Sequence, residues 1–298
     1  IMKDAIKNRY EFVVLFEVEN GNPNGDPDAG NMPRIDPETG LGIVTDVCLK
    51  RKIRNYVETI KEDSEGYRIY IKDGVPLNRT DQEAYTYIGA DEKSIAKYTK
   101  EEKDQKDELI KDFMCSNFYD IRTFGAVLTT FVKAKLNCGQ VRGPVQIGFA
   151  RSVDPIVQQE ITITRVAITT EKDALKKETE MGRKHIIPYA LYRVEGYISA
   201  NLARKSTGFS EADLELLWDS IINMFEHDRS AARGNMNVRE LIVFKHSSEL
   251  GECPAYKLFD TITVKRKDES TPPRSYHDYE VTIDEDSIPS SVELTRMI

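Results

Sequence analysis

The sequence predicts an α+β fold whose core elements follow the order strand, helix, strand, strand, helix, strand, with long insertions between them. Two observations carry this prediction. Stretches that alternate apolar and polar residues, typical of half-buried strands, recur from Tyr10 to His246. Between them lie two stretches with helical apolar spacing, each preceded by a capping residue. This order is the ferredoxin-like pattern, shared with the RNA-recognition-motif fold, whose sheet often presents one face to single-stranded RNA. Because the pattern hosts many functions, it does not identify one.

The first strand and helix of the core are clearly marked. Residues 10–19 alternate, with one face made of Phe12, Val14, Phe16 and Val18. A helix follows a cap at Thr45 or Asp46, and its apolar stripe consists of Leu49, Ile53, Val57 and Ile60. Three cations lie off that stripe and predict a basic helix face that binds phosphates or is simply solvated: Lys50, Arg51 and Arg54.

Residues 61–118 predict an insertion between core elements. The stretch 61–98 is polar and weakly periodic. Thr99 and Glu102 fit a capping box that opens a charged helix. We expect its inner face to consist of Leu109, Ile110, Phe113 and Met114.

The second half of the chain supplies the remaining core elements. A strand begins at Gly143, and residues 160–200 predict an extended β-hairpin with a charged tip near 171–184. Ser210 and Asp213 cap a strongly amphipathic helix. A further strand spans 239–246, and the acidic tail contains a candidate strand at 280–283.

Charge is unevenly distributed along the chain. The net charge of the 298 residues is −8, yet residues 121–205 carry 14 basic and 7 acidic side chains, a net charge of +7. This block is a candidate surface for a polyanion, unless folding mixes it with acidic segments. No apolar run approaches the roughly 20 residues of a membrane span, and the four scattered cysteines suit a reduced thiol pool. We therefore expect a cytoplasmic protein without metal or other cofactor.

The loop after the first strand, residues 20–28, is the most unusual segment. Asp26 and Asp28 are candidates for a metal site or a general base, although the calcium-loop pattern is not met. A second interpretation is that proline and glycine set the backbone while both aspartates face water. We favour a third, in which the backbone and the amides of Asn22 and Asn24 contact RNA.

Other candidate residues give little support to an enzyme. Arg122 is a candidate phosphate ligand or a partner for Asp120 or another neighbour, and Phe124 either stacks on a base or is buried. His227 beside Asp228 suggests a general base, but no nucleophile is spaced to accompany it. Nucleotide-binding, zinc-protease and serine-hydrolase motifs do not occur.

Several blocks together resemble a known family. They are 21–27 (GNPNGDP), 118–125 (FYDIRTFG), 143–146 (GPVQ), 152–156 (SVDPI), 225–234 (FEHDRSAARG) and 272–276 (PPRSY). In this order, over nearly the whole chain, they resemble the backbone subunit of the type I-C CRISPR Cascade complex, a member of the RAMP superfamily. The resemblance implies a ribonucleoprotein of antiviral defence, not an enzyme.

The resemblance also implies an architecture and partners. We expect an RNA-recognition-like palm with a C-terminal wrap (1–60, 119–150 and 191–298), a finger-like insertion (61–118) and a thumb-like hairpin (151–190). Copies would stack head to tail on guide RNA as a helical filament, pair the guide with target DNA and meet other Cascade subunits. The expected RNA contacts are Asn22, Asn24, Lys50, Arg51, Arg54, Arg122, Arg142, Gln146, Arg183, Lys184 and Arg233.

Two alternatives remain open. Backbone subunits of the related type III complexes cut RNA with an aspartate on a palm loop, so Asp26 is the candidate for a metal-dependent endoribonuclease of the RAMP superfamily. A generic RNA-binding module without a CRISPR role is the other alternative.

Overall fold

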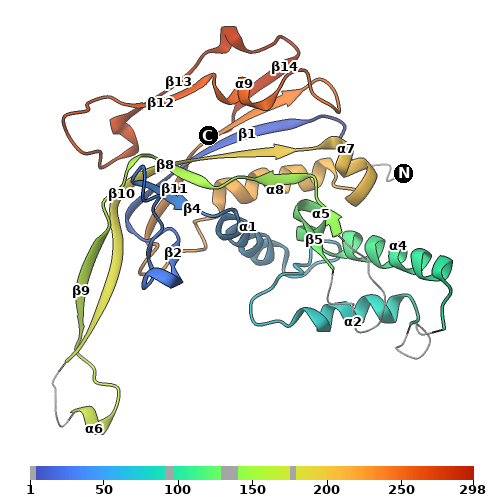
Figure 1. Ribbon diagram of the computed structural model, residues 1–298, viewed down its shortest axis with the longest axis horizontal. Helices are drawn as coiled ribbons and strands as arrows, with labels where there is room; N and C mark the ends of the chain where they lie inside the picture. The colour runs from blue at the N-terminus through green and yellow to red at the C-terminus, as the bar shows by residue number, and fades with distance from the viewer. Residues whose placement is uncertain (1–4, 91–96, 129–139, 175–178) are drawn as a thin grey trace.

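The computed structural model describes residues 5–90, 97–128, 140–174 and 179–298 (Figure 1). Its strands are β1 (Tyr10–Gly21), β2 (Gly25–Asp26), β3 (Met32–Pro33), β4 (Leu41–Val44), β5 (Gly125–Val127), β6 (Gln140–Arg142), β7 (Val145–Ile147), β8 (Ala150–Pro155), β9 (Gln159–Arg165), β10 (Glu180–Ile198), β11 (Asn235–His246), β12 (Ile262–Arg266), β13 (Tyr279–Ile283) and β14 (Val292–Arg296). Its α-helices are α1 (Asp46–Lys61), α2 (Leu77–Tyr87), α4 (Lys100–Asn117), α5 (Tyr119–Phe124), α6 (Glu171–Ala174), α7 (Ala200–Leu202), α8 (Glu211–Asn223) and α9 (Ala255–Phe259). Parts of the expected finger-like insertion (91–96), palm (129–139) and hairpin tip (175–178) lie outside the described residues.

The main sheet is antiparallel, with the strand order β14-β11-β1-β10-β8-β4; β7 and β9 also pair with β10. Since β1 and β8 both run antiparallel to β10, they are parallel to each other with β10 between them. In the same way β10 and β11 are parallel with β1 between them. The strands of the first pair, β1 and β8, are therefore separated by β10, and those of the second pair, β10 and β11, are separated by β1. A ferredoxin-like core requires this arrangement. The α+β class with an antiparallel sheet is confirmed.

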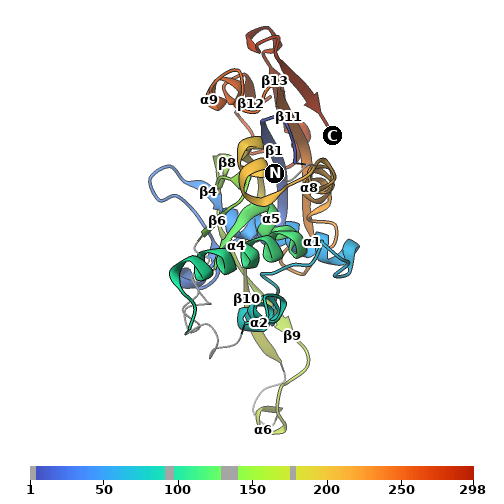
Figure 2. The same cartoon turned by 90° about the vertical axis from the view of Figure 1, so that its right-hand side faces the viewer.

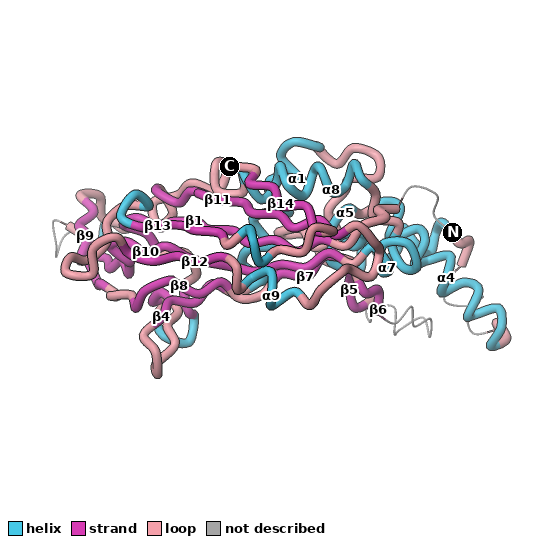
Figure 3. Tube along the Cα trace, turned by 90° about the horizontal axis from the view of Figure 1, so that it is seen from above, coloured by secondary structure: helices cyan, strands magenta, loops and turns pink. Residues whose placement is uncertain are grey.

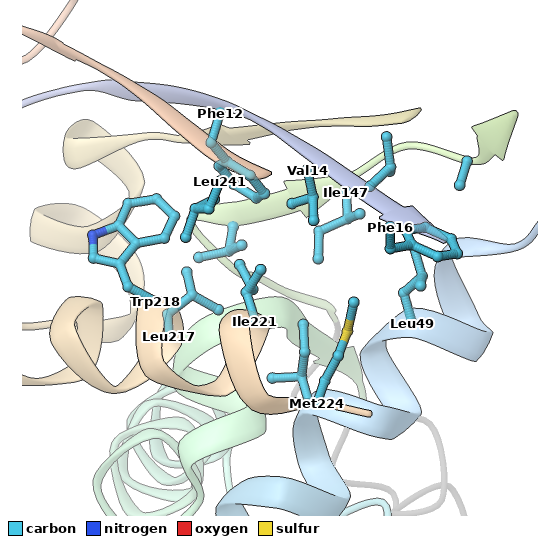
Figure 4. Packing of buried hydrophobic residues seen from close by; sticks show 14 of the residues in the cluster. Phe12, Val14, Phe16, Leu49, Ile147, Leu217, Trp218, Ile221, Met224 and Leu241 are labelled. Carbon is cyan, nitrogen blue, oxygen red and sulfur yellow. The ribbon is translucent and has the colours of Figure 1, made fainter. Parts of the chain in front are cut away.

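Helices α1 and α8 cover one face of this sheet, as Figures 1 and 4 show. Even-numbered residues of β1, among them Phe12 and Phe16, point into this layer, where Trp218 of α8 packs edge-on against Phe12 at 5.3 Å between ring centroids. The capping residues expected at Thr45, Thr99 and Ser210 all cap their helices. Two stripe residues were assigned wrongly, because Ile60 and Leu109 are exposed in the described part of the chain.

The C-terminal segment covers much of the opposite face. Val13 and Leu15 of β1 pack there against α9, β12 and β13, so β1 is buried on both sides. Two buried carboxylates hold the segment in place: Glu17 accepts a hydrogen bond from the backbone of Tyr276, and Glu240 pairs with Arg296. The C-terminal segment therefore covers this part of the sheet face, with an apolar contact flanked by ion pairs.

Residues 66–90 and 97–128 form a helical module with a hydrophobic core of its own, around Ile110, Met114 and Phe118. Buried Asp120 of α5 joins the module to α1, because its carboxylate accepts from Arg54 Nε at 2.8 Å and from the backbone N–H groups of Tyr70 and Ile71.

A two-stranded hairpin projects from the other side of the sheet, away from the C-terminal layer (Figures 1 and 2). β9 pairs with the outer part of β10, from Gln159 opposite Ile186 to Arg165 opposite Glu180. This confirms the expected hairpin, but β10 begins at Glu180, earlier than the alternation from Tyr189 suggested. Among the described residues, no helix is long and apolar enough to cross a membrane.

Candidate nucleic-acid interface

The loop after β1 is a compact turn held by its own asparagines. Buried Asn22 donates through Nδ2 to the carbonyl of Asn31 at 2.7 Å, which closes the small β2–β3 hairpin. Asn24 accepts from the backbone N–H and the hydroxyl of Thr45, both at 3.0 Å. Thr45 is the N-cap of α1, so Asn24 fixes the loop against the start of that helix. Both asparagines were expected to contact RNA. In the structure their side-chain amides form hydrogen bonds that hold the loop in its conformation.

Three segments far apart in sequence meet at this loop. The backbone N–H of Asn22 donates to the carbonyl of Ala232 at 2.8 Å. Lys184, in the hairpin, donates from Nζ to the carbonyl of Ala231 at 3.4 Å. A Cβ at Gly21 would lie 3.0 Å from the Ala232 carbonyl oxygen, so a larger residue would separate the two backbones. The loop 22–31, the segment 226–234 and the base of the hairpin therefore form one continuous surface, here called the hairpin-base surface.

A buried ion pair organises the segment 226–234. Lys52 of α1 pairs with Asp228, whose carboxylate also accepts from Arg233 Nε at 2.8 Å. The Lys52 and Asp228 side chains are 6% and 11% exposed, whereas that of Arg233 is 36% exposed. Asp228 thus serves two cations, and the outer one, Arg233, faces solvent. Burial raises the pKa of the adjacent Cys48 thiol despite these cations, so Cys48 is a packing residue here.

His227 and Asp228, the neighbours that suggested a general base, have different partners in the structure. The His227 ring lies 5.9 Å from the ring of Tyr56, and Asp228 is engaged by Lys52 and Arg233. The structure gives no hydrogen bond between this carboxylate and the imidazole among the described residues, and so no support to a general base here.

The hairpin carries a further cation, Arg183, on the face opposite Lys184, because successive residues of a strand point to opposite faces. The Arg183 side chain is 70% exposed, and its only recorded partner in the described part of the chain is Glu160, at 3.2 Å. Exposed pairs of this kind contribute little to stability, so a phosphate can replace the carboxylate at small cost. Of the expected contacts, the structure brings Lys184 and the segment of Arg233 together, while Arg183 faces solvent on the opposite face of the hairpin.

The basic face expected on α1 is largely occupied inside the protein. Lys50 pairs with Asp46 at 2.9 Å and lies over the ring of Phe124, and Arg51 donates to the carbonyl of Ile71 at 2.8 Å. Arg54 is buried against Asp120. The expectation that all three face solvent is wrong for Arg54. A position off the apolar stripe does not have to face solvent, because the helical module packs there and its Asp120 pairs with Arg54.

Arg122 is also an internal residue. Its guanidinium forms two parallel hydrogen bonds to the carboxylate of Asp213, at 2.8 and 2.7 Å, and donates to the carbonyls of Cys115 and Gly66. The bidentate partner is thus a carboxylate at the start of α8, not a phosphate. Phe124 is buried, in line with the packing alternative.

Arg142 and Gln146 lie at the far end of the sheet. Gln146 is paired in register with Tyr197, next to Ile198, which pairs with Tyr10 at the start of β1. Asn22 follows Gly21 at the end of β1. The length of β1 separates the two ends by about 35 Å, so these two residues do not join the hairpin-base surface.

Asp26 has local partners. Its carboxylate accepts from the backbone N–H of Asp28 at 3.1 Å and lies 3.5 Å from the guanidinium of Arg34. In the part of the chain that the structure describes, no group of three or more His, Cys, Asp or Glu side chains could hold a metal ion.

The sequence analysis missed two residues that support this surface, Lys52 and Arg34. Lys52 directly follows Arg51, but its side chain pairs with Asp228, which is 176 residues away in sequence. Helical spacing relative to the apolar stripe gave no signal for it. Arg34 follows the loop by a few residues, and a cation so close in sequence to Asp26 could have suggested their ion pair.

Comparisons with known proteins agree on one family. A family model described as CRISPR-associated protein Cas7 matches residues 8–284. A curated CRISPR-associated protein Cas7 from Haloferax volcanii is 29% identical over 238 residues, which cover 72% of this chain and 65% of the relative's length.

Solved structures give weaker likenesses. A chain of a CRISPR RNA-guided surveillance complex in a pre-nicking state is similar with a TM-score of 0.47 at 14% identity, covering 83% of each chain. A second surveillance complex has a TM-score of 0.46 at 13% identity, covering 79% of this chain and 68% of the other. A type III-B Cmr-beta complex bound to cognate target RNA has a TM-score of 0.39 at 13% identity, covering 79% and 61%. All three scores lie below 0.5, so the family match rests on the sequence.

Proposed function

The chain belongs to the Cas7 family of CRISPR-associated proteins, and from that premise we propose that it is the repeating backbone subunit of a CRISPR interference complex. It binds guide RNA along its length and presents the guide for pairing with target DNA. On the motif resemblance we assign it to subtype I-C.

One observation about the structure carries this proposal. Segments separated by up to about 200 residues, at 22–31, 184 and 226–234, converge on one surface that carries Lys184 and Arg233, with Arg183 on the opposite face of the same hairpin. Guanidinium and ammonium groups on one surface suit a row of phosphates. The buried Lys52–Asp228 pair and the Asn22 and Asn24 hydrogen bonds keep this surface rigid, which lowers the ordering cost of binding.

The projecting hairpin supports a head-to-tail assembly. A two-stranded hairpin is marginal in isolation. In the described part of the chain, strand β9 of this hairpin is exposed along its whole length. Ile161 and Ile163 are each 41% exposed on one face of it. We propose that this hairpin is the thumb that lies over RNA held by the next copy, with the sheet as palm and 61–118 as fingers. Such a contact is heterologous and does not close, so it builds a filament.

The same geometry favours a holding role over cleavage. Asp26 is engaged by the Asp28 backbone and by Arg34, whereas hydrolysis by metal ions needs several converging ligands. We therefore propose that this subunit is not an enzyme and that other Cascade subunits act on the target.

The test is RNA uptake by the purified protein at several salt concentrations, compared with the double variant Lys184→Ala/Arg233→Ala. The proposal expects cooperative binding that weakens steeply with salt and a flatter salt slope for the variant. A matched control is Lys257→Ala, a cation on α9 remote from the surface. A parent protein that takes up no RNA would contradict the function.

A further inference from the structure

The sheet carries an exposed groove that runs from its middle, at Arg151 and Arg193, to the end opposite the hairpin, at Gln146 and Tyr197. Two hollows of about 450 and 540 Å³ lie side by side, with Tyr197 of β10 lining both. Val264 of β12 borders the first and Asn201 of α7 borders the second. The groove therefore lies on the face opposite α1 and α8, where the C-terminal layer stops (Figure 3).

Aromatic side chains are exposed in this groove. Phe149 is 56% exposed and Tyr197 is 40% exposed. The Tyr197 ring is held edge-on against Phe259 at 5.5 Å, so its orientation is fixed while part of its surface stays free. Gln146 lies directly opposite Tyr197 in the strand pairing and so on the same face. Exposed rings on a rigid sheet are platforms on which unpaired bases stack.

The side chains that line the groove carry a net positive charge. Each lining carboxylate has a positive partner: Glu195 pairs with Arg193 at 3.0 Å, Glu249 with Arg204 at 2.9 Å, and Glu11 with Arg9. Arg142 is exposed and has no recorded ion pair in the described part of the chain. Arg151, whose side chain is 51% exposed, uses one nitrogen for Asp36 and keeps others for a further acceptor.

We propose that this groove binds a stretch of single-stranded DNA, with bases stacked on Phe149 and Tyr197 and phosphates contacted by Arg142 and Arg151. The assignment rests on the proposed function, because a guide that pairs with one DNA strand leaves the complementary strand unpaired. Along β1, the Tyr197 end of the groove lies about 33 Å from Gly21, whereas Arg151, which pairs with Arg193 opposite Leu15, lies about 20 Å from it. A strand held in the groove is therefore distinct from a strand held at the hairpin-base surface, and the expected RNA contacts Arg142 and Gln146 are reassigned to the DNA strand.

The experiment uses protein already saturated with guide RNA and a labelled oligothymidylate of about 20 nucleotides, long enough to fill such a site. The oligothymidylate cannot pair with a guide that lacks adenine runs. The expected result is salt-dependent binding that falls on the order of tenfold for each ring removed by Phe149→Ala and Tyr197→Ala, since stacking on one ring typically contributes that factor. Tyr256→Ala is the control, because Tyr256 is 61% exposed but does not line the groove.

Three further measurements make the outcome decisive. RNA loading, thermal stability and self-association are measured for the single variants and for the double variant Phe149→Ala/Tyr197→Ala. All three stay at the parent's level if the groove serves DNA alone. A double variant that loses RNA loading instead would place the groove on the guide path, and one that loses only self-association would make it a protein interface; both overturn the assignment. DNA affinity equal to the parent's also overturns it. Failure of the parent to load RNA contradicts the proposed function, whereas normal loading with no DNA binding contradicts the groove alone.

Discussion

Replacing Arg122 with alanine separates the phosphate-binding interpretation from the structural one. The Arg122 side chain is 10% exposed and its partner Asp213 is 3% exposed. The substitution removes two hydrogen bonds to the carboxylate and leaves the Cys115 and Gly66 carbonyls without this donor. Asp213 keeps hydrogen bonds from the Ser210 backbone and hydroxyl, but its buried charge loses its counterion.

Breaking a buried pair in this way costs about 3–5 kcal/mol of unfolding free energy. For a chain of this size such a loss lowers the melting temperature on the order of 10 °C. Removing both charges in Arg122→Ala/Asp213→Ala should cost less than the sum of the single changes, because no unpaired charge remains.

The assay is thermal unfolding, followed by RNA binding well below the melting temperature. Arg183→Ala is the control, because its side chain is 70% exposed and should change stability by less than about 0.5 kcal/mol. We expect Arg122→Ala to lose stability and, where folded, to bind RNA nearly as the parent does. An unchanged melting temperature together with a large loss of RNA affinity would show that Arg122 contacts phosphate and would refute the structural role.

Three further outcomes follow from the same geometry. Lys184→Ala and Arg233→Ala should each weaken RNA binding and reduce the slope of log affinity against log salt by about 1, measured by fluorescence anisotropy; unchanged slopes would place the contacts elsewhere. Replacing residues 166–179 by an Asn-Gly turn joins Arg165 to Glu180, which are already paired, so the protein should stay folded but form shorter filaments on RNA in electron microscopy; filaments of parental length would contradict the thumb assignment. Asp26→Ala should leave labelled complementary RNA and DNA as intact as the parent does with magnesium or manganese present; cleavage by the parent that the variant lacks would establish the ribonuclease alternative.

Helix α1 shows where local pattern stops being informative. Its start at Thr45, its apolar stripe and its place after the first strand follow from spacing and capping, which are properties of neighbouring residues. Its cations look alike in sequence, yet Arg54 finds Asp120 at 66 residues' separation and Lys52 finds Asp228 at 176. Which of them faces solvent depends on partners that helical periodicity does not encode.

The sequence by itself determined the order of core strands and helices, the hairpin, the three helix caps and, through its motifs, the family. These features depend on short-range spacing or on the identity of residues within short blocks. Only the tertiary structure decided that the C-terminal segment covers one face of the sheet, that Arg122 is buried, and that Arg233 and Lys184 meet while Arg142 lies at the other end. The physical reason is that burial and ion pairing are fixed by contacts between segments distant along the chain, and a side chain bound to such a partner is no longer available to a ligand.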